Sequence, residues 1–492
     1  MNNKRDITGA RNLTMMTDLY QLTMMYGYYR HGMTKNEAVF DLFFRNRENS
    51  AYAVMAGTES VIDYINSLRF EEDDLEYLRS LKLFDEEFLD VLRNLRFTGE
   101  VYGMPEGTVV FPYEPLIRVR APIMQAQLVE TALLNLVNHQ TLIATKAARV
   151  VYAAAGDDVM EFGLRRAQGP DAGIYGARAA MIGGCTATSN VLTGQMFHVG
   201  VKGTHAHSWV MSFPTELEAF RAYADIFPTS CLLLVDTYDT LRSGVPNAIK
   251  VFDELKARGC KPVGIRLDSG DLAYLSKKAR QMLDEAGHAG VKIFASGDLD
   301  ETVIRDLKTQ GAKIDVWGVG TKLITSLDCP ALGGVYKLSA EFIGGVEHPK
   351  IKLSDNVAKM TNPGYKKVLR LYDRKNGMAL ADLIALADEE IDENRPLRIY
   401  HPEQRYKTKI LSNFTVRELL VPLFVEGRQV YEPPEMSEIQ AYAKRELATF
   451  WEESKRLLNP HEYKVDLSDR LYELKQRLIR EHSSSNDAAI GK

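Results

Sequence analysis

Residues 262–271 read PVGIRLDSGD, a short run of mainly apolar residues that ends in charged residues and glycine. The following stretch, LAYLSKKARQMLDEAG (272–287), has the apolar spacing of an amphipathic helix. The same pairing recurs with SCLLLVDTYDT (230–240), VKIFASGD (291–298) and KIDVWGVGT (313–321) as the strands. Four strand–helix units in succession predict a parallel sheet with crossover helices. Gly259, Gly287 and Gly311 are placed to close three of these helices.

Polar residues and glycines gather at the carboxyl end of each predicted strand. They are Asp236 and Asp239; Arg266, Asp268, Ser269 and Asp271; Ser296, Gly297 and Asp298; and Gly318, Gly320 and Thr321. In a (β/α) barrel the active site is built from these strand ends. Helix capping can explain Asp271 or Asp298. It does not explain Arg266 inside GIRLDSG, so we favour an active site here.

The flanking segments follow other patterns. Residues 97–127 alternate apolar and polar residues between glycine and proline turns, which predicts antiparallel strands. Residues 128–150 are typical of a helix. Strands return after residue 333, and Asn376-Gly377 is a strong hairpin signal. Residues 435–481 have the charge pattern of surface helices, and we expect a mobile tail after them.

The composition limits the possible functions. The chain has 492 residues, too many for one ordinary core, so we expect two or three domains. A net charge of −5 argues against binding to nucleic acid or a membrane surface, while it allows a local basic pocket for phosphate. The four cysteines (Cys185, Cys231, Cys260 and Cys329) are far apart, which predicts neither a disulfide framework nor a zinc cluster. Neither a signal peptide at residues 1–12 nor a bilayer-spanning apolar run is visible, which favours the cytoplasm.

Two histidines, His205 and His207, lie in GTHAHSWVMSF (203–213), and three interpretations compete. If this stretch is a strand, both side chains point to one face and could bind a metal. A zinc site usually needs a third ligand, however, and the only other histidine in 208–330, His288, follows a helix. Burial without chemistry is the second interpretation. The third is a nucleophile or general base, because histidine can carry a phosphoryl group.

Three segments are candidates for binding phosphate or ribose. In DVWGVGTKL and FASGD, a strand runs into glycines whose backbone N–H groups can approach a phosphate. In EFGLRRAQGPDAG (161–173), Arg165 and Arg166 lie in a glycine-rich turn, and arginine forks suit phosphate oxygens. In GIRLDSGD, Asp268 and Asp271 could accept ribose hydroxyls or hold Mg²⁺ through water, and Arg266 could face a planar anion.

Together these segments resemble the nicotinate phosphoribosyltransferase family. The matching stretches, in the family's order, are TDLYQLTMMYGY (17–28), EFGLRRAQGPDAG (161–173), TSNVLTG (188–194), GTHAHSWV (203–210), LLLVDTYDT (232–240), GIRLDSGD (264–271), FASGD (294–298) and GVGTKL (318–323). The resemblance implies an ATP-dependent ligase of NAD biosynthesis. Nicotinate would attack C1 of 5-phosphoribosyl 1-diphosphate to give nicotinate mononucleotide and diphosphate, with Mg²⁺ and with ATP hydrolysis coupled through a phosphohistidine.

The resemblance also implies an architecture. We expect an α/β fold with an N-terminal α+β domain (1–130), an irregular (β/α) barrel that carries the active site (131–340), and C-terminal strands and helices (341–492). A homodimer with shared active sites is implied as well.

Roles for individual residues follow from the same resemblance. His207 would be the phosphorylated histidine, and His205 would take no part. Nicotinate would be bound by Phe162, Thr204, Arg266 and, from the neighbouring subunit, Tyr20. Phosphoribosyl diphosphate would be bound by Arg165, Asp268, Gly297, Gly318, Gly320 and Thr321. Mg²⁺ ligands are not assigned.

Alternatives stay open at this point. Nicotinamide phosphoribosyltransferase shares these motifs, but an amide substrate invites a carboxylate acceptor and GGCTATSNVLTG (183–194) contains none. A metal-dependent barrel hydrolase would use the HxH pair, and a sensor would bind nicotinate without turnover. Retention of His207, Arg266 and both glycine loops argues against the sensor.

Overall fold

The computed structural model describes residues 11–45, 52–354, 356, 359–404 and 406–490, with side chains up to residue 483. Residues 1–10, for which we predict no signal peptide, and the last two residues of the predicted tail lie outside this description. The chain divides into two compact units: unit 1 comprises 1–142 and 331–492, and unit 2 comprises 143–330. The first boundary falls within the long helix α6 (Glu130–Ala154), where we predicted a helix.

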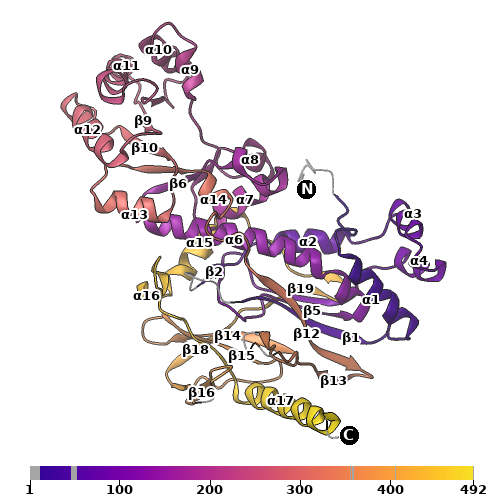
Figure 1. Ribbon diagram of the computed structural model, residues 1–492. Helices are drawn as coiled ribbons and strands as arrows, with labels where there is room; N and C mark the ends of the chain where they lie inside the picture. Colours follow the sequence, from indigo (N-terminus) through magenta and orange to yellow (C-terminus); the bar gives the residue numbers. More distant parts are fainter. Residues whose placement is uncertain (1–10, 46–51, 355, 357–358, 405, 491–492) are drawn as a thin grey trace. The chain divides into compact units, whose positions relative to one another are not determined.

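Unit 2 is built on a six-stranded parallel sheet (Figure 1). Its strand order is β7 (Ala187–Thr188), β6 (Asp158–Glu161), β11 (Val316–Val319), β10 (Lys292–Gly297), β9 (Gly264–Leu267) and β8 (Leu232–Leu234). The crossover helices are α11 (Val245–Ala257), α12 (Leu272–Glu285), α13 (Glu301–Thr309) and α14 (Thr321–Ile324). The four predicted strand–helix units are therefore confirmed.

The local sequence explains these elements. Strand β11, VWGV, is buried along its whole length, as expected of a parallel strand covered on both faces. Gly259, Gly287 and Gly311 adopt φ values of +75°, +78° and +76°, so they do terminate helices in the left-handed conformation. In the part of the chain that the structure describes, no ladder joins β8 to β7, so the barrel wall is open on that side.

Strands β6 and β7 were not singled out in the sequence. They extend the sheet beyond β11, and the pairing of β6 with β11 places Glu161 opposite Val319. The remaining helices of unit 2 are η1 (Leu164–Arg166), α7 (Pro170–Ile182), α8 (Val191–Phe197), α9 (His207–Met211), α10 (Glu216–Ile226) and the π-helical turn η2 (Thr240–Gly244). The EFG turn after β6 therefore lies beside the GVG loop after β11.

Unit 1 contains a seven-stranded antiparallel sheet. Its order is β13 (Val346–Pro349), β12 (Gly334–Ile343), β1 (Glu37–Phe44), β5 (Ile117–Pro122), β3 (Glu100–Gly103), β19 (Val421–Val425) and β20 (Arg428–Gln429). The antiparallel strands predicted in 97–127 are thus present. In this one sheet, three strands from the first part of the chain lie side by side and later strands flank them on both edges. The sequence led us to place these parts in separate domains.

A second sheet of unit 1 has the order β17 (Thr408–Leu411), β16 (Leu397–Tyr400), β21 (Val465–Leu467), β15 (Ala379–Leu386), β14 (Lys366–Asp373) and β18 (Phe414–Glu418). The predicted hairpin at Asn376-Gly377 joins β14 to β15, with Gly377 at φ +70°. The other elements of unit 1 are the two-stranded sheet of β2 (Ala53–Val54) and β4 (Val109–Val110) and eight helices that lie wholly within its described residues. These helices are α1 (Leu19–Arg30), α2 (Thr58–Ser67), α3 (Glu72–Ser80), α4 (Glu86–Arg93), α5 (Ile123–Leu128), α15 (Met436–Ala448), α16 (Glu452–Lys455) and α17 (Asp469–Ile490). The backbone of α17 runs through most of the stretch for which we predicted a mobile tail.

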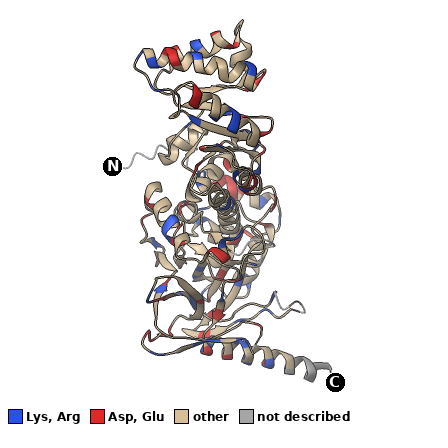
Figure 2. Cartoon of the chain, turned by 90° about the vertical axis from the view of Figure 1, so that its left-hand side faces the viewer, with Lys and Arg blue, Asp and Glu red and all other residues tan. Residues whose placement is uncertain are grey.

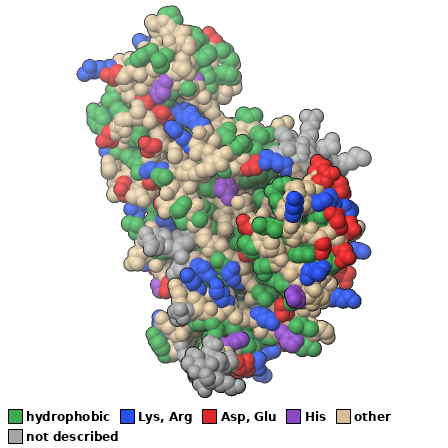
Figure 3. Space-filling model, turned by 45° about the vertical axis from the view of Figure 1, so that its right-hand side comes forward, with side chains coloured by type: hydrophobic (Ala, Val, Ile, Leu, Met, Phe, Trp, Pro, Cys, Tyr) green, Lys and Arg blue, Asp and Glu red, His purple; other side chains and the backbone are tan. Residues whose placement is uncertain are grey.

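The surface carries both signs of charge. Acidic and basic residues both occur along the described part of α17 (Figure 2), and charged side chains of both signs lie among hydrophobic ones on the face shown in Figure 3. Such mixing agrees with a net charge close to zero. None of the described helices has the length and apolar character needed to cross a bilayer.

A buried ion network fastens the second sheet of unit 1. The fully buried Arg370 guanidinium on β14 pairs with Asp382 on β15 (2.6 Å) and with Glu446 on α15 (3.0 Å), and it donates to the carbonyl of Val109 (2.7 Å). Arg417 on β18 reaches the same Glu446 carboxylate at 2.7 Å. Arg370, Asp382 and Glu446 are out of water, whereas Arg417 is 37% exposed. Each buried charge faces an opposite charge, so the buried part of the network depends on all its members.

Removing one charge should therefore be costly. We expect Arg370→Met to leave Asp382 buried without its cation and Glu446 with Arg417 alone. This change should lower the free energy of unfolding by about 3–5 kcal/mol in urea denaturation. The control is Arg395→Met, because Arg395 and its partner Asp392 are 84% and 50% exposed and such pairs contribute little. Equal stability of the two variants would contradict this interpretation.

Candidate active site

The carboxyl ends of β8, β9 and β10 bring polar side chains into direct contact. Arg266 on β9 donates through Nε to the Ser296 hydroxyl (2.8 Å) and through Nη2 to Asp268 Oδ1 (2.9 Å). The Ser296 hydroxyl in turn donates to the same Asp268 oxygen (2.5 Å). Three side chains from neighbouring strands therefore hold one another in place. The Arg266 side chain is only 16% exposed, so its guanidinium has little freedom to reorient.

Asp268 is held in its ionised form. Burial by itself tends to raise the pKa of this carboxyl, but the hydrogen bonds from Arg266 and Ser296, with the nearby positive charge of Arg266, keep the pKa below its usual value. Both hydrogen bonds go to Oδ1. Oδ2 therefore stays available to a ligand or to His207.

A second carboxylate lies at the end of the neighbouring strand β8. Asp236 Oδ2 accepts from the backbone N–H of Asp268 (3.0 Å) and from the Ser269 hydroxyl (2.5 Å). Its Oδ1 is buried and has no hydrogen-bond donor among the described residues. An orphaned carboxylate oxygen close to a second carboxylate suits a hard cation, which prefers oxygen ligands.

The two histidines do not lie on a strand, so the condition for the metal-pair interpretation is not met. Residues 202–206 have no regular secondary structure, and α9 begins at His207. His207 is 39% exposed, with Nδ1 3.1 Å from the Thr237 hydroxyl and Nε2 3.8 Å from Asp268 Oδ2. His207 thus joins the Arg266–Asp268–Ser296 group with one face open to a ligand.

His205 points elsewhere. Its ring is buried, packs edge-on against Tyr223 (4.7 Å between centroids) and accepts the backbone N–H of Leu234 on Nε2 (3.3 Å). Burial lowers its pKa to about 4, so the ring is neutral at physiological pH. The hydroxyl of Thr204, a predicted nicotinate contact, donates to the carbonyl of Leu232 (2.7 Å). Both side chains tie this loop to β8.

Two glycine loops border the group. Gly297 has φ +116°, and a Cβ there would lie 2.9 Å from the carbonyl oxygen of Asp268. A Cβ on Gly318 would lie 2.6 Å from the Phe162 ring, so this ring packs directly on the GVG loop. A Cβ on Gly320 would come within 3.3 Å of the Phe162 carbonyl oxygen. Glycine is therefore required by close packing at Gly297 and Gly318.

The other predicted site residues have the following places. Thr321 begins α14, which is four residues long. Arg165 is exposed in η1, two residues beyond the turn after β6. Tyr20 belongs to unit 1, where α1 exposes Leu19, Tyr20 and Met24 by 50%, 47% and 39%. Tyr20 is thus solvent-accessible, as a residue that contacts a second subunit must be in the isolated chain.

Capping accounts for part of the polar pattern at the strand ends. Asp271 caps α12 by accepting the N–H of Tyr274 (2.9 Å), as helix capping allowed. Helix α13 is capped by Asp300 instead of Asp298. Arg266 makes no cap and belongs to the site.

Sequence reasoning gave no role to three residues of this region. Thr237, which contacts His207, follows Asp236 directly, and Ser296 was noted only as a strand-end residue. Glu161 is fully buried at the end of β6 and accepts from Thr188 (2.6 Å). A signal existed for Glu161, since a charged residue preceding Phe162-Gly163 stands at a strand end.

The arrangement of the side chains does not favour metal ligation by the histidine pair. Within the described ranges, no group of three or more His, Cys, Asp or Glu side chains is arranged to hold a metal ion. The strand that would have aligned His205 and His207 is not formed.

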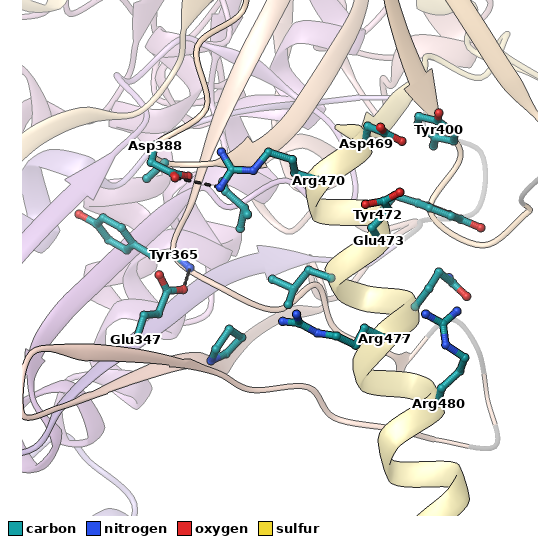
Figure 4. Close-up of a pocket in the computed structure, with 15 residues that line it drawn as sticks. Glu347, Tyr365, Asp388, Tyr400, Asp469, Arg470, Tyr472, Glu473, Arg477 and Arg480 are labelled. Carbon is teal, nitrogen blue, oxygen red and sulfur yellow. Dashed lines mark hydrogen bonds and ion pairs between the residues drawn. The ribbon is translucent and has the colours of Figure 1, made fainter.

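A recess in unit 1 (Figure 4) has a volume of about 930 Å³. It is bordered by β13, the end of β15 and α17. Its charged groups are largely engaged: Arg470 pairs with Asp388 (2.9 Å), and Glu347 accepts the backbone N–H of Tyr365 (2.8 Å). None of the predicted site residues lines this recess.

Two family models match the chain. The N-terminal domain of nicotinate phosphoribosyltransferase matches residues 15–138, and the C-terminal domain of the same enzyme matches residues 365–475. Both matched segments lie within unit 1.

Full-length relatives extend the similarity over unit 2. The chain is 50% identical over 474 residues to nicotinate phosphoribosyltransferase of Bacillus subtilis, with 96% of each chain covered. It is 36% identical over 525 residues to the enzyme of the same name from Caenorhabditis elegans, covering 93% of this chain and 92% of the relative. The crystal structure of human nicotinic acid phosphoribosyltransferase superposes with a TM-score of 0.84 at 33% identity, covering 94% and 99% of the two chains.

The environment of His205 leads to a prediction about pH. Its pKa falls from 6.5 to about 4 on folding, so the unfolded chain binds more protons between these values. Stability that is present above pH 6.5 should therefore be lost as the pH falls towards 4. An NMR titration should give a midpoint near pH 4 for the His205 ring.

The control is the exposed His461 in unit 1. His205→Gln should remove part of the acid destabilisation, whereas His461→Gln should not. A His205 midpoint near 6.5 would show that the ring is not buried as described.

Proposed function

The chain belongs to the nicotinate phosphoribosyltransferase family, and on that premise we propose that it couples ATP hydrolysis to nicotinate mononucleotide synthesis through a phosphohistidine at His207. The substrates are nicotinate and 5-phosphoribosyl 1-diphosphate, and diphosphate is the second product. The observation that carries this proposal is the contact of His207 with Asp268 at the strand ends, within 4 Å and beside the glycine loops.

Nicotinate is an aromatic anion, and the site offers a cation and a ring for it. The Arg266 guanidinium is fixed by Ser296 and Asp268 and can face the carboxylate of nicotinate. The Phe162 ring, seated on Gly318, can cover one face of the pyridine. Tyr20 of a second subunit would cover the other face, and its exposure on α1 beside Leu19 supports a homodimer with shared sites.

The stretch 183–194 bears on the choice between nicotinate and nicotinamide. It contains no acidic residue, but the structure brings the Glu161 carboxylate against Thr188. Both oxygens of Glu161 are engaged, by Thr188 and by the backbone N–H of Gly163. This carboxylate is thus occupied internally and is not offered to an amide substrate.

The phosphoribosyl group has donors and acceptors at the adjoining loops. Asp268 Oδ2 is free of Arg266 and can accept a ribose hydroxyl. Backbone N–H groups at Gly297, Gly318 and Gly320, with Thr321, would hold phosphate oxygens. Arg165 is exposed and can reach an anionic group.

The residues present also fit Mg²⁺. The buried, unpartnered Asp236 Oδ1 and the nearby Asp268 carboxylate would hold the ion directly or through water. Mg²⁺ would neutralise charge that develops on the leaving diphosphate.

The positioning of the groups then explains the transfer. The C1–O bond to diphosphate breaks as the pyridine nitrogen bonds to C1, through an oxocarbenium-like transition state. Arg266 and the aromatic rings hold the nitrogen in line, and the glycine loops hold the phosphates, so the reaction gains from orientation and fixed charge.

ATP acts by phosphorylating His207. A ring nitrogen would take the γ-phosphoryl group as the bond to ADP breaks, and water would later release phosphate and restore the imidazole. Phosphorylation adds negative charge beside Asp268, so it would reorganise the cation and the diphosphate site. Hydrolysis would then reset the site.

The direct test measures nicotinate mononucleotide formed from nicotinate and phosphoribosyl diphosphate with Mg²⁺, with and without ATP. Nicotinamide runs in parallel. Product from nicotinate that increases with ATP supports the proposal. Product only from nicotinamide, or none from either base, would overturn it.

The role of His207 has its own test. His207→Ala should abolish stimulation by ATP and the incorporation of label from γ-labelled ATP, while some ATP-independent synthesis remains, because the base and phosphate contacts are untouched. His461→Ala, which removes an exposed histidine in unit 1, is the control. Unchanged coupling in His207→Ala would remove this residue from the mechanism.

Sharing of sites between subunits can be tested by mixing two variants. Tyr20→Ala and His207→Ala should each lack ATP-coupled activity, but a mixed dimer contains one intact site of two. An equal mixture that has exchanged subunits should recover about a quarter of wild-type coupled activity, since half the dimers are mixed. No recovery, with exchange verified by differently tagged chains, would place Tyr20 outside the partner's site.

A further inference from the structure

Glu161 is a buried carboxylate with no assigned role in the reaction. Its side chain is completely inaccessible at the carboxyl end of β6. Burial raises its pKa, and the groups that oppose this rise are neutral donors, the Thr188 hydroxyl and the Gly163 backbone N–H. Burying a carboxylate among neutral donors costs folding free energy, so its presence here points to a specific task.

One of its oxygens organises the turn after β7. Glu161 Oε2 accepts the Thr188 hydroxyl at 2.6 Å, and that hydroxyl accepts the backbone N–H of Asn190 at 3.0 Å. The Glu161 carbonyl accepts the N–H of Ser189 at 3.0 Å. The buried Asn190 side chain then caps α8 by accepting from Thr193 (3.2 Å). The path of residues 188–190 therefore depends on Glu161.

Its other oxygen organises the turn that carries Phe162. Glu161 Oε1 accepts the backbone N–H of Gly163, so the carboxylate closes over the residue between them. Phe162 itself donates its N–H to the carbonyl of Val319 (2.8 Å), and its ring packs on Gly318. The backbone on both sides of Phe162 is thereby fixed.

The two turns frame the base pocket in the function proposed above. One presents Phe162, and the other carries the half-buried Ser189 between Thr188 and Asn190, whose buried side chains are hydrogen-bonded internally. We propose that Glu161 is a positioning residue that sets the affinity for nicotinate by clamping these two turns together. This inference rests on the proposed function, because its readout is the binding of the base.

The chemistry of the clamp makes Glu161→Gln the informative change. The carboxylate accepts two hydrogen bonds with two oxygens, whereas the carboxamide has one oxygen and an NH₂ group of similar size. The Gly163 N–H can only donate, so the carboxamide oxygen would accept it and the NH₂ group would face Thr188. The Thr188 hydroxyl would lose its charged acceptor, and the turn after β7 would loosen. Thr188→Val removes the same link from the other side while keeping the shape.

The experiment compares steady-state constants of Glu161→Gln, Thr188→Val and the double variant with those of the wild type. We expect each single variant to raise KM for nicotinate roughly tenfold, the size expected for loss of one hydrogen bond to a charged group. KM for phosphoribosyl diphosphate and kcat should change by less than about twofold. The double variant should have a KM for nicotinate no higher than that of the more impaired single variant, because both changes break the same link.

The matched control is Glu216→Gln, which alters another buried glutamate of unit 2 that accepts from Asn247 (2.9 Å). It should leave KM for nicotinate unchanged. Thermal unfolding of all variants separates positioning from folding.

Two results would overturn the inference. One is an unchanged KM for nicotinate in a folded Glu161→Gln protein, and the other is an equal loss for all substrates that follows a fall in thermal stability. Either result concerns Glu161 alone as long as the wild type forms nicotinate mononucleotide. Failure of the wild type to use nicotinate would instead refute the proposed function.

Discussion

The ion pair between Arg266 and Asp268, bridged by Ser296, is the interaction around which the site is arranged. It fixes a cation and an anion at the end of β9, and Ser296 links both to the adjacent strand β10. Asp268 Oδ2 faces His207, and the backbone N–H of Asp268 donates to the Asp236 carboxylate. Asp236 and His207 are thus both positioned by contact with Asp268. The strength of the pair comes from limited exposure, since partly buried charges are screened less by solvent.

Backbone packing provides the second constraint. The Phe162 ring rests on Gly318, and Gly297 lies against the carbonyl oxygen of Asp268, so larger residues would displace the charged group or the ring. The Glu161 carboxylate closes the EFG turn by accepting the backbone N–H of Gly163. The glycines first considered as phosphate contacts therefore also have a structural task, since they allow the strand ends to approach each other.

Local patterns predicted a large part of the fold. The four strand–helix units, the helix at 128–150 and the hairpin at Asn376-Gly377 are present because each depends on neighbouring residues. The shared sheet of unit 1 was not predicted: β12 and β19 pair with strands far away in the chain. Such pairing leaves no local signal. Whether 203–213 forms a strand stayed open in the sequence for a related reason, since alternation of two histidines over three residues does not distinguish a strand from a loop entering a helix.

The sequence by itself determined the chemistry available to this protein: a strand-end arginine and aspartate, two glycine loops and a histidine pair, in an order that identifies the family. Only the tertiary structure decided which histidine meets the carboxylate. His205 turns inward because it satisfies the N–H of Leu234, whereas His207 begins a helix beside Thr237 and Asp268. It also revealed the task of Glu161, because its partners Thr188 and Gly163 come together only when β6 and β7 pair. Side-chain direction in a loop depends on contacts with distant strands, and these contacts exist only in the folded chain.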